Sequence, residues 1–219
     1  MIITIDGPAA AGKGTLAAAL AEKYKLSYFD TGMTYRAVGL EMILNGKDLH
    51  DQAAATEFAR ELTFPKMMEL SRHKDFRGDR GGQAATAVAT MQPVRDYLTQ
   101  MMRDFGKNPV FADGSPAQGV IYDGRDTGTV VCPQADIKFY LKAAPEIRAE
   151  RRLKDFAAKG INISFEEVLE HVKRRDESDY QRKGTWPADD AVIFDTSDLG
   201  IDEVIAKASK IIDDKRKNS

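Results

Sequence analysis

Cysteine, histidine and long apolar runs are all scarce in this chain of 219 residues. It has one cysteine, Cys132, so no intrachain disulfide can form, and we expect a reducing, cytoplasmic location. Its three histidines, His50, His73 and His171, are scattered without the spacing of metal ligands. No apolar run approaches the length that spans a bilayer, so we expect a soluble protein with no membrane partner.

An excess of charge of either sign is also missing. Lys and Arg number 32 against 34 Asp and Glu, which gives a formal net charge of -2. Nonspecific nucleic-acid binders are usually basic, so we expect no nucleic-acid partner. Hydrophobic residues make up 42% of the chain, which is enough for a full core. The length suits one compact α/β domain, alone or with a small insert.

Short apolar strands alternate with helical patterns along the chain. The predicted strands are residues 2–6, 27–30, 120–123, 137–141 and 190–195. The predicted helices are about residues 14–24, 33–44, 94–105, 145–159 and 201–212, and a further helix opens at a capping box, residues 164–167. This alternation predicts an α/β fold with a parallel sheet covered on both faces by helices.

The least regular stretch, residues 47–93, is interpreted as an insert flanked by helices. Within it, residues 76–82 read Phe-Arg-Gly-Asp-Arg-Gly-Gly, and we do not expect this segment in a core. Residues 106–119 are expected to form a loop, in which residues 110–112 resemble a strand fragment.

The strongest functional signal is a segment of small residues between the first predicted strand and the first predicted helix. It consists of Gly7, Pro8, Ala9, Ala10, Ala11, Gly12, Lys13, Gly14 and Thr15. Small residues let successive backbone N–H groups converge on a phosphate, and Lys13 adds a charge for the β and γ oxygens. A flexible turn is the plain alternative, but such a turn would rarely place Lys and Thr at these positions. We therefore predict a phosphate loop that binds a nucleotide.

Gly14 stands where the general loop pattern has the Ser or Thr whose hydroxyl contacts Mg²⁺, and Thr15 follows one position later. We therefore expect weak or absent metal contact from the loop. The ion should be held by the phosphates and by water, with Asp123, at the end of a predicted strand, as an outer partner.

Two groups of charged residues are candidates for binding polar ligands. Arg175, Asp179 and Arg182 are spaced i, i+4, i+7 and share one helix face if the helix continues, although a surface ion-pair ladder would have the same spacing. Residues 123–126, Asp-Gly-Arg-Asp, follow a predicted strand, where ligands bind in open parallel sheets. The alternative for this second group is a polar tight turn. An Arg fork suits phosphate, and Asp accepts from amino or hydroxyl groups.

Several segments, spread over nearly the whole chain, match the motifs of one protein family and occur in the same order as in that family. They are the loop with its Gly-Lys-Gly-Thr variant, residues 30–32 with Tyr35 and Arg36, residues 86–89 leading to 94–95, residues 123–131, Arg148 with residues 151–152, the 175/179/182 set, and residues 190–191 with 195–197. In these segments the chain resembles bacterial cytidylate kinases. The resemblance implies the fold of P-loop nucleoside monophosphate kinases. It implies a core ATP-binding domain of residues 1–46 and 94–219, a lid of about residues 148–182, and a monophosphate-binding insert of residues 47–93.

The resemblance also implies a role for each matching residue. The loop would hold ATP, and the catalytic set would be Lys13 with the lid arginines Arg148, Arg151 and Arg152. The acceptor's phosphate would be bound by Arg36, Arg125 and Arg182. Cytosine would be read by Thr86, Arg95 and Asp126. The ribose would be met by Arg175 and Asp179, with Thr31 nearby.

The expected reaction is in-line phosphoryl transfer from ATP, with Mg²⁺, to CMP or dCMP, by a monomer whose partners are these small molecules. A kinase for UMP or AMP remains an alternative, and so does a nucleotide-binding switch without turnover. A guanine-specific switch would need an Asn-Lys-x-Asp motif, which the sequence does not contain. The chain departs from the family in a compressed, Gly-rich segment between residues 75 and 83 and in an apparently extra loop, residues 109–119.

Overall fold

The computed structural model describes residues 1–158, 160–181 and 184–218, and the chain divides into two compact units. The first unit comprises Met1–Tyr28 and Gln118–Ser219, and the second comprises Phe29–Ala117. The predicted insert, residues 47–93, falls within the second unit. None of the helices in the described part of the chain is long and apolar enough to cross a membrane.

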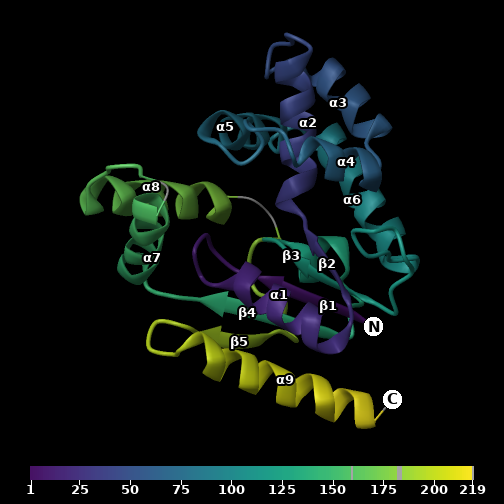
Figure 1. Cartoon of the computed structure of the whole chain (residues 1–219), viewed down its shortest axis with the longest axis vertical. Helices are drawn as coiled ribbons and strands as arrows, with labels where there is room; N and C mark the ends of the chain where they lie inside the picture. The colour runs from purple at the N-terminus through teal and green to yellow at the C-terminus, as the bar shows by residue number, and fades with distance from the viewer. Residues whose placement is uncertain (159, 182–183, 219) are drawn as a thin grey trace. The chain divides into compact units, whose positions relative to one another are not determined.

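A five-stranded sheet has the strand order β2-β3-β1-β4-β5 (Figure 1). The strands are β1 (Ile2–Asp6), β2 (Ser27–Asp30), β3 (Val120–Asp123), β4 (Ile137–Lys142) and β5 (Val192–Asp195). The central strand β1 pairs in parallel with β3 and β4, and β4 pairs in parallel with β5. In this register Ile5 lies opposite Asp123 and Asp6 lies opposite Tyr140. The carboxyl ends of β1, β3 and β4 therefore meet at one edge, where parallel sheets bind ligands.

Both faces of β1 are buried, which explains its short apolar run. Ile3, Thr4 and Ile5 are fully buried, and Asp6 is 5% exposed. Strands of a parallel sheet covered on both faces have this character. The parallel sheet predicted from the sequence is confirmed.

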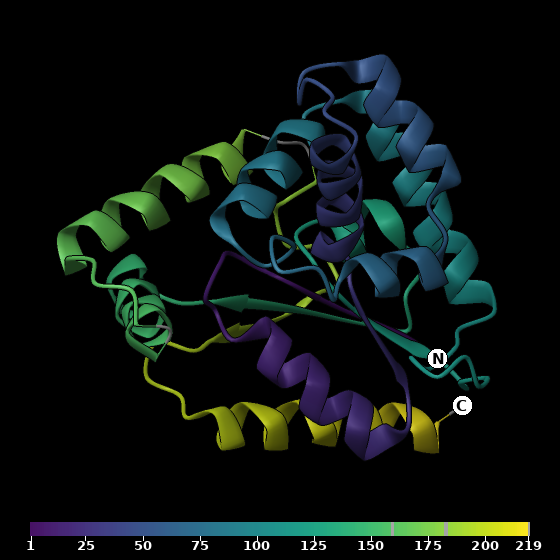
Figure 2. The same ribbon diagram turned by 45° about the horizontal axis from the view of Figure 1, so that its top comes forward.

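Two helices of the first unit, α1 (Lys13–Tyr24) and α9 (Ile201–Lys217), run side by side along the sheet (Figures 1 and 2). Leu16 and Leu20 of α1 and Ile212 of α9 join the apolar side chains of the strands in one buried cluster. Each fully buried aliphatic side chain of this kind stabilises the fold by about 1.5–3 kcal/mol. This packing fixes the start of α1 against the end of β1.

A helical hairpin follows β4 in the first unit (Figure 1). It consists of α7 (Pro145–Ala158) and α8 (Phe165–Tyr180), which share a small core with Ala149 on one helix and Val168 and Val172 on the other. The predicted capping box is confirmed: Glu167 donates its N–H to Ser164 Oγ at 3.2 Å, and Ser164 donates its N–H to Glu167 Oε2 at 3.0 Å.

The end of α8 limits one expectation from the sequence. The helix ends at Tyr180, so of the expected shared face it carries Arg175 and Asp179. Arg182, expected to bind the acceptor's phosphate, lies outside the described residues.

Helices build the second unit. They are α2 (Gly32–Leu44), α3 (Gln52–Glu61), α4 (Phe64–Leu70), α5 (Asp79–Val88) and α6 (Gln92–Lys107). The helices predicted at residues 33–44 and 94–105 are confirmed as α2 and α6. Helices α2 and α5 approach closely at Gly39, where an added Cβ would lie 2.8 Å from Ala84. The absence of a side chain at Gly39 permits this approach.

The expectation that residues 76–82 avoid the core is wrong. The Phe76 side chain is fully buried, and Gly81 is buried as well. A Cβ at Gly81 would lie 2.3 Å from the Asp75 carbonyl oxygen, so only glycine lets α5 begin so near the preceding turn. The glycines that made the segment look like a surface loop instead allow its backbone to pack tightly.

The loop expected at residues 106–119 begins later than predicted, because α6 continues to Lys107, and it is closed by an isolated bridge between Val110 and Pro116. The Phe111 N–H donates to the Ser115 carbonyl at 2.8 Å. The strand-like segment of residues 110–112 therefore pairs with residues of the same loop.

Candidate functional site

A sharp turn of small residues joins β1 to α1 in the first unit. Gly7 has φ 139°, and a Cβ there would lie 2.0 Å from the Leu141 carbonyl oxygen, so no other residue fits beside β4. Gly12, at φ 93°, is the N-cap of α1. Ala10 also has a positive φ, 60°, although it is not glycine. The turn ends at the positive N-terminus of α1, which is the geometry of an anion-binding loop.

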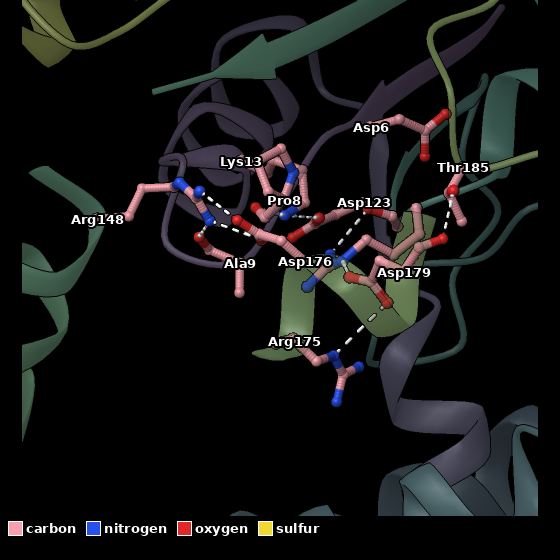
Figure 3. A network of polar contacts seen from close by, with 12 residues as sticks. Asp6, Pro8, Ala9, Lys13, Asp123, Arg148, Arg175, Asp176, Asp179 and Thr185 are labelled. Atoms are coloured by element: carbon pink, nitrogen blue, oxygen red, sulfur yellow. Dashed lines mark hydrogen bonds and ion pairs between the residues drawn. The ribbon is translucent and has the colours of Figure 1, made fainter. Parts of the chain in front are cut away.

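Lys13 opens α1 with its side chain only 6% exposed. Its ammonium donates to the Pro8 carbonyl at 2.9 Å and lies 3.9 Å from Asp123 Oδ1 (Figure 3). The lysine is thus folded over its own loop and held near the carboxylate at the end of β3. This brings together Lys13 and Asp123, two residues that the sequence singled out separately.

Asp123 also lies beside Gly14, the unusual glycine of the loop. A Cβ at Gly14 would lie 3.3 Å from Asp123 Oδ2 and 3.4 Å from the Tyr28 hydroxyl. Tyr28 in turn donates its hydroxyl to the same Oδ2 at 3.3 Å. Thr15 is exposed on α1. A carboxylate therefore lies near the position from which a loop hydroxyl would meet a metal ion, and carboxylate oxygen suits Mg²⁺.

Two arginines flank the buried carboxylate of Asp179 on α8, and Figure 3 shows one of them, Arg175, beside it. Arg125 donates Nε–H to Asp179 Oδ2 at 3.1 Å, and Arg175 Nε lies 3.6 Å from Oδ1. Desolvation, with the neighbouring charges of Arg125 and Arg152, lowers the pKa of the Arg175 guanidinium from its ordinary value. A single carboxylate therefore faces several positively charged guanidinium groups. A bound phosphate or other anion would reduce the repulsion among these positive charges.

A carboxylate that the sequence analysis missed secures the turn after Asp126. Asp6 accepts hydrogen bonds from the Thr127 N–H and hydroxyl and from the Gly128 N–H, at 2.9, 2.8 and 2.7 Å. These donors belong to one turn of π-helix, η1 (Thr127–Val131), that follows the Asp-Gly-Arg-Asp segment. Burial raises the pKa of the Asp6 carboxyl, although these hydrogen bonds act in the opposite direction. An Asp at the end of an otherwise apolar buried strand was the available signal.

The three arginines of α7 have different surroundings. Arg148 is 3% exposed and binds the carboxylate of Asp176 through two N–H groups, at 2.9 and 2.5 Å. Arg151 binds Thr196, whereas Arg152 is exposed, with its guanidinium 5.2 Å from the centroid of the Phe156 ring. Asp176 was missed in the sequence, and Thr196 was noted there without a role.

In the second unit, Arg36 and Thr86 meet the same part of α5. Arg36 donates to the Phe76 carbonyl at 2.9 Å, and a Cβ at Gly82 would lie 3.7 Å from its guanidinium nitrogens. Thr86 donates its hydroxyl to the Gly82 carbonyl at 3.0 Å. The other two candidates of this unit lie on different helices: Thr31 caps the start of α2, and Arg95 is in the first turn of α6.

Among the described residues no group of three or more His, Cys, Asp or Glu side chains is placed to hold a metal ion.

Comparison with known proteins places the chain in one family. The cytidylate kinase family model matches residues 3–214. A cytidylate kinase of Paramagnetospirillum magneticum is 44% identical over 217 residues, covering 98% of this chain and 99% of that protein. The cytidylate kinase of Azorhizobium caulinodans is 43% identical over 218 residues, covering 99% and 100%.

Solved structures show a likeness of fold. An uncharacterized protein from Eubacterium ventriosum superposes with a TM-score of 0.54 at 13% identity, covering 97% of this chain and 98% of that one. At that identity the likeness concerns the fold alone. The match of sequence is much stronger and covers nearly all of the chain, which confirms the resemblance seen in its motifs. The chain belongs to the cytidylate kinase family.

Proposed function

We propose that this protein transfers the terminal phosphoryl group of ATP to CMP or dCMP, giving ADP and CDP or dCDP. The observation that carries the proposal is the pairing of a phosphate loop with a carboxylate, Asp179, flanked by Arg125 and Arg175. One group suits the phosphates of a donor nucleotide, and the other suits the phosphate and sugar of an acceptor. The family membership supports cytosine as the base.

On the donor side, the backbone N–H groups of the loop and the start of α1 would bind the ATP phosphates. Lys13 is already close to the loop, so its charge can follow the electrons that move onto the β–γ bridging oxygen. The arginines of α7, Arg148, Arg151 and Arg152, add positive charge to this side of the site. Electrostatic stabilisation of this kind supplies most of the rate in phosphoryl transfer.

On the acceptor side, we assign roles by chemistry. In the first unit, Arg125, together with Arg182, would bind the acceptor's phosphate, while Arg175 and Asp179 would meet the ribose hydroxyls. Asp126 would accept from the exocyclic amine of cytosine. For the candidates of the second unit, the assigned roles are phosphate binding for Arg36, a place near the sugar for Thr31, and base recognition for Thr86 and Arg95. The monophosphate is already ionised, so the reaction needs no general base.

Mg²⁺ would accompany ATP, and Asp123 would be its outer partner through water. The carboxylate beside Gly14 fits this role, because it is an oxygen ligand next to the lysine that binds the same phosphates. When bound, the ion neutralises charge on the transferring phosphoryl group.

We also propose that the chain acts as a monomer in the cytoplasm, with residues 47–93 contributing to acceptor binding and residues 148–182 acting as a lid. All the roles above are assigned to residues of one chain. Small nucleotides are its only partners in this scheme.

A coupled assay of ADP formation tests the proposal. Purified protein is given ATP and Mg²⁺ with CMP, dCMP, UMP, AMP or no acceptor in turn. We expect the highest kcat/KM with CMP or dCMP. Faster turnover of UMP or AMP would contradict the base assignment. Tight ATP binding without turnover of any acceptor would instead indicate a nucleotide-dependent switch.

A further inference from the structure

Arg148 uses most of its N–H donors in hydrogen bonds within the protein. Its Nε–H donates to the Ala143 carbonyl at 2.9 Å, and its Nη1 reaches the Ala9 carbonyl of the phosphate loop at 3.4 Å (Figure 3). Both terminal nitrogens also bind the Asp176 carboxylate. These four contacts use most of the five N–H donors of a guanidinium, and the side chain is 3% exposed. Little of it remains to bind a phosphate.

Arg151, one turn further along α7, contacts the next loop carbonyl. Its Nη1 lies 3.5 Å from the Ala10 carbonyl oxygen, and the guanidinium also donates to the hydroxyl and carbonyl of Thr196, at 3.1 and 2.5 Å. Thr196 is 4% exposed, and its hydroxyl shares its hydrogen between the carbonyls of Ala11 and Lys142, at 3.2 and 3.3 Å. A third successive loop carbonyl is thus bound from outside the loop.

Contacts to three successive carbonyls determine where three N–H groups point. A peptide group is planar and trans, so the carbonyl of one residue and the N–H of the next lie in the same plane and point in opposite directions. Fixing the carbonyls of Ala9, Ala10 and Ala11 outward therefore directs the N–H groups of Ala10, Ala11 and Gly12 to the opposite side, where a phosphate binds. Cationic donors on two of the carbonyls also polarise those peptide groups, so that their N–H groups become stronger donors to a phosphate.

We infer that Arg148, Arg151 and Thr196 are positioning residues that brace the phosphate loop before any nucleotide arrives, and that they do not themselves contact the transferred phosphoryl group. Arg152 is the arginine of α7 that meets this group. It is exposed, stacks on Phe156, and lies near enough to Arg175 for the two charges to act on each other. The inference concerning Arg152 rests on the proposed kinase function, whereas the bracing of the loop does not.

The test compares Arg151→Lys and Thr196→Val with Arg152→Lys as the matched control on the same helix. The first two variants change the outer contacts to the loop and keep volume and charge nearly unchanged. Arg148→Lys is a further variant, because it keeps a cation beside Asp176. The first readout is the ¹⁵N order parameter of the Ala10, Ala11 and Gly12 amides in protein without nucleotide. We expect a fall from the range of rigid backbone, about 0.85, toward the flexible range, below about 0.6, in the bracing variants only.

Nucleotide affinity is the second readout. Losing a bracing contact should lower the affinities for ADP and ATP equally, by about tenfold, because the loop binds phosphates that both nucleotides have. Arg152→Lys should leave ADP affinity and loop order unchanged and should lower kcat. Unchanged loop order and ADP affinity in Thr196→Val and Arg151→Lys, together with a lower kcat, would overturn the inference. So would a loss of ADP affinity with the loop still rigid.

The two proposals can fail separately. If the wild-type protein turns over no monophosphate, the kinase function and the role of Arg152 fail. The order parameters and the ADP titration still decide whether the loop is braced.

Discussion

Thr127 donates both its backbone N–H and its hydroxyl to Oδ1 of Asp6, at 2.9 and 2.8 Å. The N–H of Gly128 donates to the other carboxylate oxygen at 2.7 Å. The strand that leads into the phosphate loop thereby also holds the turn that follows Arg125 and Asp126. One buried side chain orients the segments on the two sides of the proposed reaction.

Asp6 should make stability depend on pH in a predictable direction. Burial raises its pKa in the folded state above 3.8, so the folded protein binds this proton more tightly than the unfolded chain. The resulting contribution to stability is fully present below the unfolded pKa and is lost as pH rises through the folded pKa. Asp6→Asn cannot titrate. Urea unfolding of both proteins measures this effect over the pH range between the unfolded and the folded pKa of Asp6. As pH rises through this range, the wild type should lose stability relative to Asp6→Asn.

Thr127→Val is the matched control for this measurement. It keeps the Asp6 carboxyl and removes one hydrogen bond that favours the ionised form. The same pH dependence should persist and extend to higher pH. A stability difference between wild type and Asp6→Asn that stays constant with pH would show that Asp6 does not titrate differently on folding.

Lys13→Ala should lower kcat/KM by roughly 10²–10³-fold, the scale of losing one preorganised charge contact in a transition state. The reason is the position of the ammonium, which is folded over the loop at 2.9 Å from the Pro8 carbonyl. Steady-state kinetics with ATP and CMP measure the loss. Lys23→Ala, at the exposed end of the same helix, is the control and should be near normal. Near-normal turnover in Lys13→Ala would remove Lys13 from the mechanism.

Asp126→Ala should narrow the ratio of kcat/KM for CMP over UMP. Cytosine offers an amine to the carboxylate, whereas uracil places a carbonyl there, acceptor facing acceptor. An unpaired buried polar group costs on the order of 1–3 kcal/mol, so the wild-type enzyme should discriminate and the variant should do so much less. Arg125→Lys should lower kcat/KM for both substrates equally, because CMP and UMP have the same phosphate. An unchanged CMP/UMP ratio in Asp126→Ala would mean that Asp126 only orients its neighbours.

Ala10→Gly should stabilise the protein. Ala10 has φ 60°, a left-handed conformation that costs a residue with a Cβ roughly 1–2 kcal/mol and costs glycine almost nothing. The greater freedom of glycine in the unfolded chain offsets part of this gain, about 0.4–1 kcal/mol. Ala9→Gly has no strained φ to relieve and should lose stability by that smaller amount. Thermal unfolding of the pair measures the contrast, and a drop in Tm for Ala10→Gly would contradict the prediction.

Local patterns predicted the sheet and the loop because each is encoded in neighbouring residues. The apolar run at residues 2–6 predicts a buried strand, and the small residues that follow favour a tight turn before Lys13. The capping box at Ser164 is likewise complete within four residues. Such signals need no knowledge of which distant segment packs against them.

The unpredicted features depend on distant partners. Arg148 and Asp176 are 28 residues apart, and Arg151 and Thr196 are 45 residues apart, so spacing within a helix does not indicate either pair. The burial of Phe76 depends on the close approach that Gly81 allows. Composition suggested a surface loop there because glycine serves both open turns and tight packing.

Helix α8 carries two carboxylates three residues apart that serve different groups. Asp176 is bound to Arg148, which reaches the phosphate loop, and Asp179 is bound to Arg125 after β3. A nucleotide that shifts the loop therefore acts on the helix that also holds Arg125, the arginine proposed to bind the acceptor's phosphate. We expect occupancy at the first position to alter affinity at the second through this shared helix, and thermodynamic reciprocity then requires the same factor in reverse. The enzyme should show synergism between ATP and CMP, with a single interaction coefficient obtained from either titration.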